Sequence, residues 1–484
     1  MPPAPPSDPA AILRSRSYAG LLVLAAILGV PISAAAYGFL ALVDKLQGWA
    51  FTSLPQALGF DGMPRWWPLP LLTLAGVLVG LTIRSLPGRG GHSPADGFKA
   101  GGVASPGELP GIALAALATL SLGAVLGPEA PLIALGGGVA AWLVGLGGRP
   151  RPPQATAVVG AAGSFAAIST LLGSPLLGAF LLMEVSGLAG PSLGVVLVPG
   201  LVAAGVGSLV FVGLDSWTGL GTFSLALPDL PQAGQPTLAE FAWALGIGVA
   251  AGLVGTAIRR LALALRPHVE RRLLLATPLV GLAVGTLAVL YAQASGHDVS
   301  DVLFSGQNEL GPLVSASATY SVGALVLLIA GKGLAYGASL AAFRGGPVFP
   351  AMFLGAAGGI ALSHLPGLSM VAGIAMGIGA MSVVMLRLPL TSVLLATLLL
   401  GSDGLAVMPL VIVTVAVAYV ASARLSSSSE DAAPPGQPDH HLDEPTRTEG
   451  ERHGHRTGAA SGPGVQPSRL PRGDHRGAGA PPGE

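Results

Sequence analysis

The sequence predicts an all-α protein that crosses a membrane many times and is assembled from internal repeats with broken helices. Of its 484 residues, 51% are hydrophobic and 10% are charged, whereas a soluble globular protein carries about 25% charged residues. Several apolar segments are shorter than the roughly 17 residues that a membrane-spanning helix needs. Half-helices that meet inside the protein would explain these short segments.

One Gly-Pro pattern occurs twice inside apolar segments. The pattern G-P-x-x-P-x4-G begins at Gly127 and again at Gly346, an offset of 346 − 127 = 219. A second pattern, L-x-x-P-L, follows each copy and begins at Leu172 and at Leu386. Helix breaks at loops would explain one copy, but they explain two matched copies poorly. Matched Gly/Pro interruptions in the two halves are typical of transporters whose broken helices meet at a midplane binding site.

Glu129 lies inside the first copy, within an apolar run from 121 to 146. A carboxylate in a membrane-type segment is costly and indicates a functional site, with a capping role as the alternative. Pro128 and Pro131 suit the first turn of a helix. The free N–H groups and the positive dipole at such a helix start attract anions. We therefore expect Glu129 at the N-terminus of a helix inside the bilayer.

Composition and motifs argue against several other functions. The formal net charge is zero, so nothing indicates a nucleic-acid partner. The sequence has no cysteine, which excludes disulfides and thiolate metal sites. An intramembrane enzyme would need a nucleophile–base pair or a metal cluster, and we find neither G-x-S-x-G nor H-E-x-x-H. We expect no enzyme activity, no cofactor and no metal site.

The distribution of charge predicts the order and sidedness of the parts. No Lys or Arg lies between Arg151 and Arg259, whereas Arg259 to Arg272 is strongly basic. By the positive-inside tendency, the basic turn is cytoplasmic and the linker before it is external. The tail lacks the apolar residues of a core, so we expect it to be disordered. The expected parts are a cytoplasmic segment 1–17, a first membrane repeat 18–212, an external linker 213–236, a second membrane repeat 237–424 and a cytoplasmic tail 425–484.

The apolar segments give the expected helices of a multi-pass protein in the cell membrane, with both termini cytoplasmic. The Glu129 helix is one of them. The others are 18–43, 69–86, 109–125, 156–172, 175–188, 191–212, 238–265, 273–294, 313–340, 348–365, 368–386, 389–400 and 405–423.

At these motifs the sequence resembles the CLC family of chloride channels and chloride/proton exchangers. Residues 126–131, Leu-Gly-Pro-Glu-Ala-Pro, resemble the family's G-[K/R]-E-G-P motif, and residues 345–350 resemble its G-x-F-x-P motif. Residues 173–184 resemble the helix that follows the glutamate helix, and residues 91–94 stand where the family has G-S-G-I-P. The resemblance covers about residues 18–424.

The resemblance implies a CLC-type inverted repeat of tilted and broken helices, in a homodimer with one anion pathway per subunit. Glu129 falls on the family's gating glutamate, which competes with the anion and yields to protonation. Helix N-termini would bind chloride or another small anion without a fixed cation. The implied anion-binding residues are Gly91, His92, Ser93, Gly127, Pro128, Ala130, Gly346, Val348 and Phe349.

Some positions depart from the family pattern. The family's central serine falls on Gly91 or His92, unless Ser93 substitutes, and the motif phenylalanine falls on Val348. The family's last helix, with its anion-coordinating tyrosine, has no counterpart before the chain turns polar at Ser426. The implied function is chloride transport as a channel or a chloride/proton antiporter; the altered residues keep fluoride or another anion open.

Proton coupling depends on positions whose roles stay open. The exchangers' inner glutamate falls on Val185, which favours passive conduction because valine cannot carry a proton. Otherwise Glu184 or His92 would be the proton entry group, although Glu184 could instead bond backbone groups and His92 could be a simple loop residue. Lys332 and Arg344 would either concentrate anions at a mouth or only pair with neighbours. Three tyrosines are expected to serve in packing: Tyr37, Tyr320 and Tyr336.

Overall fold

The computed structural model describes residues 13–98, 102–146, 153–187, 191–218, 227 and 232–426. Within these ranges the chain is almost entirely helical, and eight of the described helices are long and apolar enough to cross a membrane. Six further apolar helices have 10–17 residues. The expected tail beyond Ser426, residues 1–12 of segment 1–17, and residues 219–226 and 228–231 of linker 213–236 lie outside the described residues.

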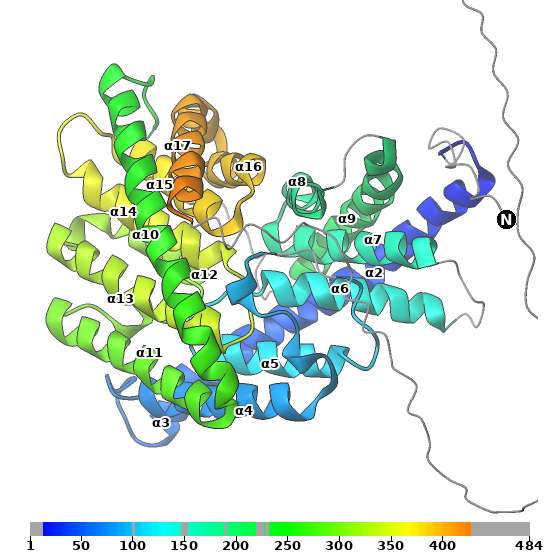
Figure 1. The fold of residues 1–484 in the computed structure, drawn as a ribbon, viewed down its shortest axis with the longest axis horizontal. Coiled ribbons are helices and arrows are strands. Elements are labelled where there is room, and N and C mark those ends of the chain that lie inside the picture. The colour runs from blue at the N-terminus through cyan, green and yellow to red at the C-terminus, as the bar shows by residue number, and fades with distance from the viewer. Residues whose placement is uncertain are drawn as a thin grey trace, which may run out of the picture. The chain divides into compact units, whose positions relative to one another are not determined.

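The described part of the first half contains seven principal helices and several short turns of helix. Their arrangement can be followed in Figure 1. The principal helices are α2 (Arg16–Gly48), α4 (Pro68–Ser85), α5 (Leu109–Ser121), α6 (Glu129–Gly145), α7 (Pro153–Leu172), α8 (Pro175–Ser186) and α9 (Pro191–Thr218). The short elements are η1 (Trp49–Ser53), α3 (Leu54–Ala57), η2 (Pro87–Gly90) and η3 (Pro94–Asp96).

The second half repeats this order, with one additional short helix. Its principal helices are α10 (Leu238–Arg271), α11 (Leu273–Ser295), α13 (Val322–Ala342), α14 (Val348–Ser363), α15 (Met370–Leu386), α16 (Pro389–Leu399) and α17 (Gly404–Leu425). The additional helix is α12 (Gln307–Ser315), and the 3₁₀ turns are η4 (Val299–Asp301), η5 (Ser317–Thr319) and η6 (Gly401–Asp403).

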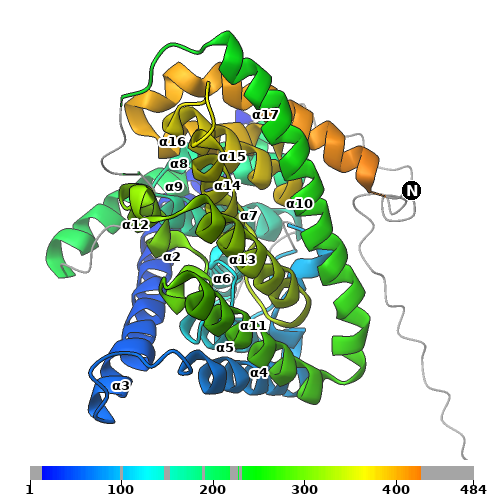
Figure 2. The ribbon, with the colours of Figure 1, turned by 90° about the vertical axis from the view of Figure 1, so that its left-hand side faces the viewer.

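The packing follows the repeat. In the first half α6 packs on α7, α2 packs on α9, and α7 packs on both α8 and α9. In the second half α14 packs on α15, α10 packs on α17, and α15 packs on both α16 and α17, which can be followed in Figures 1 and 2. Equivalent elements also pair across the halves, α4 with α11 and α8 with α16. The expected fold of repeated and broken helices is therefore confirmed.

Side-chain caps and small residues explain where helices begin and how closely they pack. Thr237 and Glu240 form a capping box at the start of α10, with both reciprocal bonds present. Between α14 and α15, a Cβ at Gly355 or Gly359 would overlap backbone of α15. These glycines therefore allow the two backbones to approach closely, as small residues do in membrane helix pairs.

The apolar run 313–340 is not one helix, contrary to our expectation. Helix α12 ends at Ser315, a short turn follows, and α13 begins after Ser321, whose hydroxyl accepts a hydrogen bond from Ala324 N at 3.1 Å. As the N-cap residue, Ser321 satisfies a free N–H group in the first turn of α13, which favours the start of a new helix there. The break brings segment 296–321 back over α13, where it contacts Lys332.

Candidate functional site

The two Gly-Pro turns meet side by side. Gly127 N donates to Gly346 O at 2.8 Å, and Gly346 N donates to Gly127 O at 2.6 Å, which makes an isolated antiparallel bridge. Pro128 and Pro347 are the N-cap residues of α6 and α14. The repeated pattern therefore places two helix N-termini at one point, one from each half of the chain.

Two buried hydroxyls support the turns from the opposite halves. Ser339 on α13 accepts from Val125 N at 3.2 Å, and Thr119 on α5 accepts from Arg344 N at 3.3 Å. Both hydroxyl residues are fully buried. The two bonds are related by the repeat, since 339 − 119 = 220 and 344 − 125 = 219. The sequence analysis did not single out either residue, although the two stand at nearly equivalent positions in the two halves of the sequence.

Glu129 is fully buried at the start of α6, and its side chain reaches the start of α14. Its Oε1 accepts from Phe349 N at 2.9 Å, and its Oε2 has no hydrogen-bond partner among the described residues. A Cβ at either Gly127 or Gly346 would overlap the carboxylate. The two glycines of the repeat thus leave the space that the carboxylate occupies.

The start of α14 is held by a tyrosine that we expected only to pack. Tyr336 is fully buried on α13, and its hydroxyl donates to Pro347 O at 2.8 Å. Since Pro347 is the N-cap of α14, this bond fixes the backbone that presents the N–H groups of Val348 and Phe349. Two helix N-termini with free N–H groups can hold an anion here, either the Glu129 carboxylate or a free one.

Gly91, His92 and Ser93 lie in a separate loop between η2 and η3. Gly91 has φ 91°, a conformation that favours glycine, and His92 is exposed. In the part of the chain that the structure describes, none of the three forms a hydrogen bond with Glu129. The loop is connected to the site through Arg344, whose Nε donates to Arg89 O at 3.4 Å. An ion pair between Asp96 and Arg266 joins its other end to α10.

Glu184 caps a helix of the opposite half. Its Oε1 accepts from Leu390 N at 2.9 Å, and its Oε2 accepts from Thr391 N at 2.8 Å and Thr391 Oγ1 at 2.7 Å. A carboxylate at the first turn of α16 stabilises the helix by satisfying free N–H groups. These bonds support the alternative in which Glu184 bonds backbone groups.

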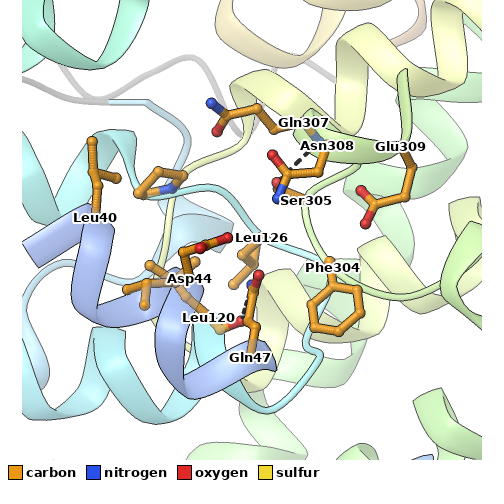
Figure 3. A pocket seen from close by; sticks show the side chains of 12 residues that line it. Leu40, Asp44, Gln47, Leu120, Leu126, Phe304, Ser305, Gln307, Asn308 and Glu309 are labelled. Atoms are coloured by element: carbon orange, nitrogen blue, oxygen red, sulfur yellow. Dashed lines mark hydrogen bonds between the residues drawn. The ribbon is translucent and has the colours of Figure 1, made fainter. Parts of the chain in front are cut away.

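A cavity of about 40 Å³ lies beside the site (Figure 3). Its wall includes Pro128, which precedes Glu129, and a set of polar side chains from α2 and segment 305–309. The polar side chains are Asp44, Gln47, Ser305, Gln307, Asn308 and Glu309. Lys332 lies nearby on α13, where it contacts the backbone of 301–303 and faces Glu309. It is fully buried and therefore does not lie at a solvent-exposed mouth of a pathway.

Metal-binding residues do not gather in the described ranges: no three His, Asp or Glu side chains there could hold a metal ion together. The site that the described residues do form has a different composition. It consists of backbone N–H groups, one carboxylate and close glycines.

A family model described as "Voltage gated chloride channel" matches residues 76–423. A similar curated protein is "Putative ion-transport protein YfeO" of Escherichia coli (strain SMS-3-5 / SECEC). It is 28% identical over 362 residues, which cover 73% of this chain and 81% of the relative. The protein of the same name from E. coli (strain K12 / DH10B) is 29% identical over 362 residues, with the same coverage of both chains.

Solved structures have the same fold. A slow cyanobacterial Cl⁻/H⁺ antiporter matches with a TM-score of 0.67 at 19% identity, covering 84% of this chain and 95% of that chain. A CLC-type fluoride/proton antiporter matches with a TM-score of 0.61 at 20% identity, with the same two coverages. The match to the family model covers 348 residues of this chain. The two solved structures share its fold.

Proposed function

Because this chain belongs to the voltage-gated chloride channel family, the CLC family, and is an ion transporter of that family, we propose that it conducts a small anion along a path gated by Glu129. The observation that carries the proposal is the position of the Glu129 carboxylate. It lies between two helix N-termini and accepts a hydrogen bond from Phe349 N at 2.9 Å. A negative group is therefore held where the fold offers donors to an anion.

The carboxylate and a transported anion would compete for this place. Ionised Glu129 closes the path because it fills the space at Gly127 and Gly346. Protonation removes the charge that the helix N-termini attract, so the side chain can leave and an anion can enter. The donors are backbone groups and not a fixed cation, which keeps binding loose enough for passage.

Chloride is the proposed anion, and fluoride is the second candidate. Among the structural neighbours, one is named a Cl⁻/H⁺ antiporter and another a fluoride/proton antiporter, which supports both candidates. Val348 stands where the family motif has phenylalanine, so the residues around the anion differ from the family pattern. Flux measured separately with each anion would distinguish the two.

We also propose a cell-membrane homodimer with the basic end of α10 in the cytoplasm. The residues at that end include Arg266, Arg271 and Arg272, and the positive-inside tendency favours this orientation. The Asp96–Arg266 ion pair then puts the loop of His92 on the cytoplasmic side. The cavity at Glu309 would face the outside, since α11 carries the chain back across the membrane.

Glu129→Gln tests the gate, because glutamine has nearly the same shape and cannot ionise. Purified protein in liposomes should keep its anion flux and lose the dependence of that flux on pH. An anion efflux assay across a pH series, with Asp61→Asn as an exposed control, measures both. A variant whose flux retains the wild-type pH dependence would show that Glu129 is not the gate.

A further inference from the structure

A second group of buried charges lies beside the cavity. Lys332 donates from Nζ to Asp301 O at 2.9 Å, Val302 O at 3.3 Å and Leu303 O at 2.8 Å. Its ammonium also lies 4.3 Å from the centre of the Phe353 ring. All three ammonium donors therefore have acceptors, as a buried charge requires.

Two acidic side chains face this cation, and their environments differ. Oδ2 of Asp301 accepts from Tyr291 at 2.9 Å and from Tyr320 at 3.0 Å. Oε2 of Glu309 is buried and has no hydrogen-bond partner among the described residues. With Lys332 positive, two ionised carboxylates would leave one excess negative charge inside the protein. The hydrogen bonds favour the ionised form of Asp301, so the proton belongs on Glu309.

Burial acts on both acids, and the two differ in the groups that oppose its effect. Burial raises the pKa of Glu309, and the positive charge of Lys332 opposes that rise. Burial also raises the pKa of Asp301, whereas its two tyrosine hydrogen bonds lower it. The other titratable groups are Asp44 across the cavity, and His297 and Asp298 beside Asp301.

The cavity is lined by Glu309 and by Pro128, the residue next to Glu129. Its 40 Å³ can hold a few water molecules, since one water needs about 10–15 Å³. Glu309 and Asp44 line it on two sides, and Pro128 forms part of the same wall. Figure 3 shows the Glu309 carboxylate pointing toward Phe304 on this wall. Among the described residues, Oε2 of Glu129, the residue after Pro128, is also a buried carboxylate oxygen without a hydrogen-bond partner.

We infer that Glu309 is the proton donor to Glu129, through water in the cavity between α2 and segment 304–309. The O–H bond on Glu309 breaks, the proton passes along the water chain, and an O–H bond forms on Oε2 of Glu129. Glu309 becomes a carboxylate beside the Lys332 ammonium and takes a new proton from solution past Asp44. This route uses neither Glu184 nor His92, and it rests on the proposed role of Glu129.

The test is a double-mutant cycle in liposomes, with anion flux and internal pH recorded together. Glu309→Gln keeps the shape of the side chain but cannot pass a proton. With Glu129 intact, it should lower proton flux, and the anion flux that depends on it, about tenfold or more. In the Glu129→Gln background, where no proton is needed, it should change anion flux less than about twofold. Glu309→Asp should restore part of the proton flux.

The outcomes separate this inference from the proposed gate. Equal losses of anion flux in both backgrounds would indicate a structural role for Glu309 and overturn the inference. A wild-type protein that moves anions without any proton flux would overturn it too, while leaving the anion path intact. Infrared spectroscopy of the purified protein gives a reading independent of transport. The carbonyl band of a protonated carboxyl should lose intensity in Glu309→Gln, and an unchanged band would refute the assignment of the proton to Glu309.

Discussion

Replacing Lys332 with methionine should destabilise the protein, because its ammonium is the only cation of the buried cluster in the described chain. The change leaves the carbonyls of 301–303 without their donor and removes the charge that faces Glu309 and Asp301. Breaking a buried charge arrangement by removing one partner costs about 3–5 kcal/mol. Methionine fills nearly the same volume, so packing contributes little to this loss.

The measurement is thermal denaturation in detergent, followed by loss of the folded peak in size-exclusion chromatography. Lys332→Met should melt several degrees below the wild type, whereas Lys45→Met on the exposed end of α2 should change stability by less than about 0.5 kcal/mol. Adding Asp301→Asn to Lys332→Met should recover about 1 kcal/mol or more, since it removes the ionised carboxylate that lost its cation. Equal melting of Lys332→Met and the wild type, or purely additive losses in the double variant, would refute the reasoning.

Two further predictions concern the site and its support. Gly346→Ala should reduce anion flux at least about tenfold, because the new methyl overlaps the space of the Glu129 carboxylate. Gly358→Ala, within the helix α14 that follows this turn, has open space and should match the wild type, so equal flux in the two variants would contradict the prediction. Glu184→Gln should lower stability by about 1–2 kcal/mol through the lost cap of α16, and its anion flux should keep the wild-type pH dependence. A changed pH profile there would instead make Glu184 a proton carrier.

The sequence predicted most helices and the meeting of the two Gly-Pro turns. Both follow from local features, since apolar runs and proline positions determine helices, and a repeat implies equivalent places in the fold. It did not predict the contacts of Lys332 or the break before α13. The break depends on single serines in an apolar run, and the Lys332 contacts depend on how segment 296–321 folds back, which no spacing rule in the sequence encodes.

The chemistry of the site arises where the repeat is broken. Glu129 and Val348 are equivalent first residues of α6 and α14, since 348 − 129 = 219, yet only one is a carboxylate. Two carboxylates here would repel each other and could not both ionise. With one carboxylate facing an apolar residue, the N–H donors of both helices are available to a single negative charge. The same asymmetry holds one helix earlier, because α13 carries Lys332 while α5 has no charged side chain. The repeat therefore builds the frame, and the residues that differ between its halves determine which half carries the charge.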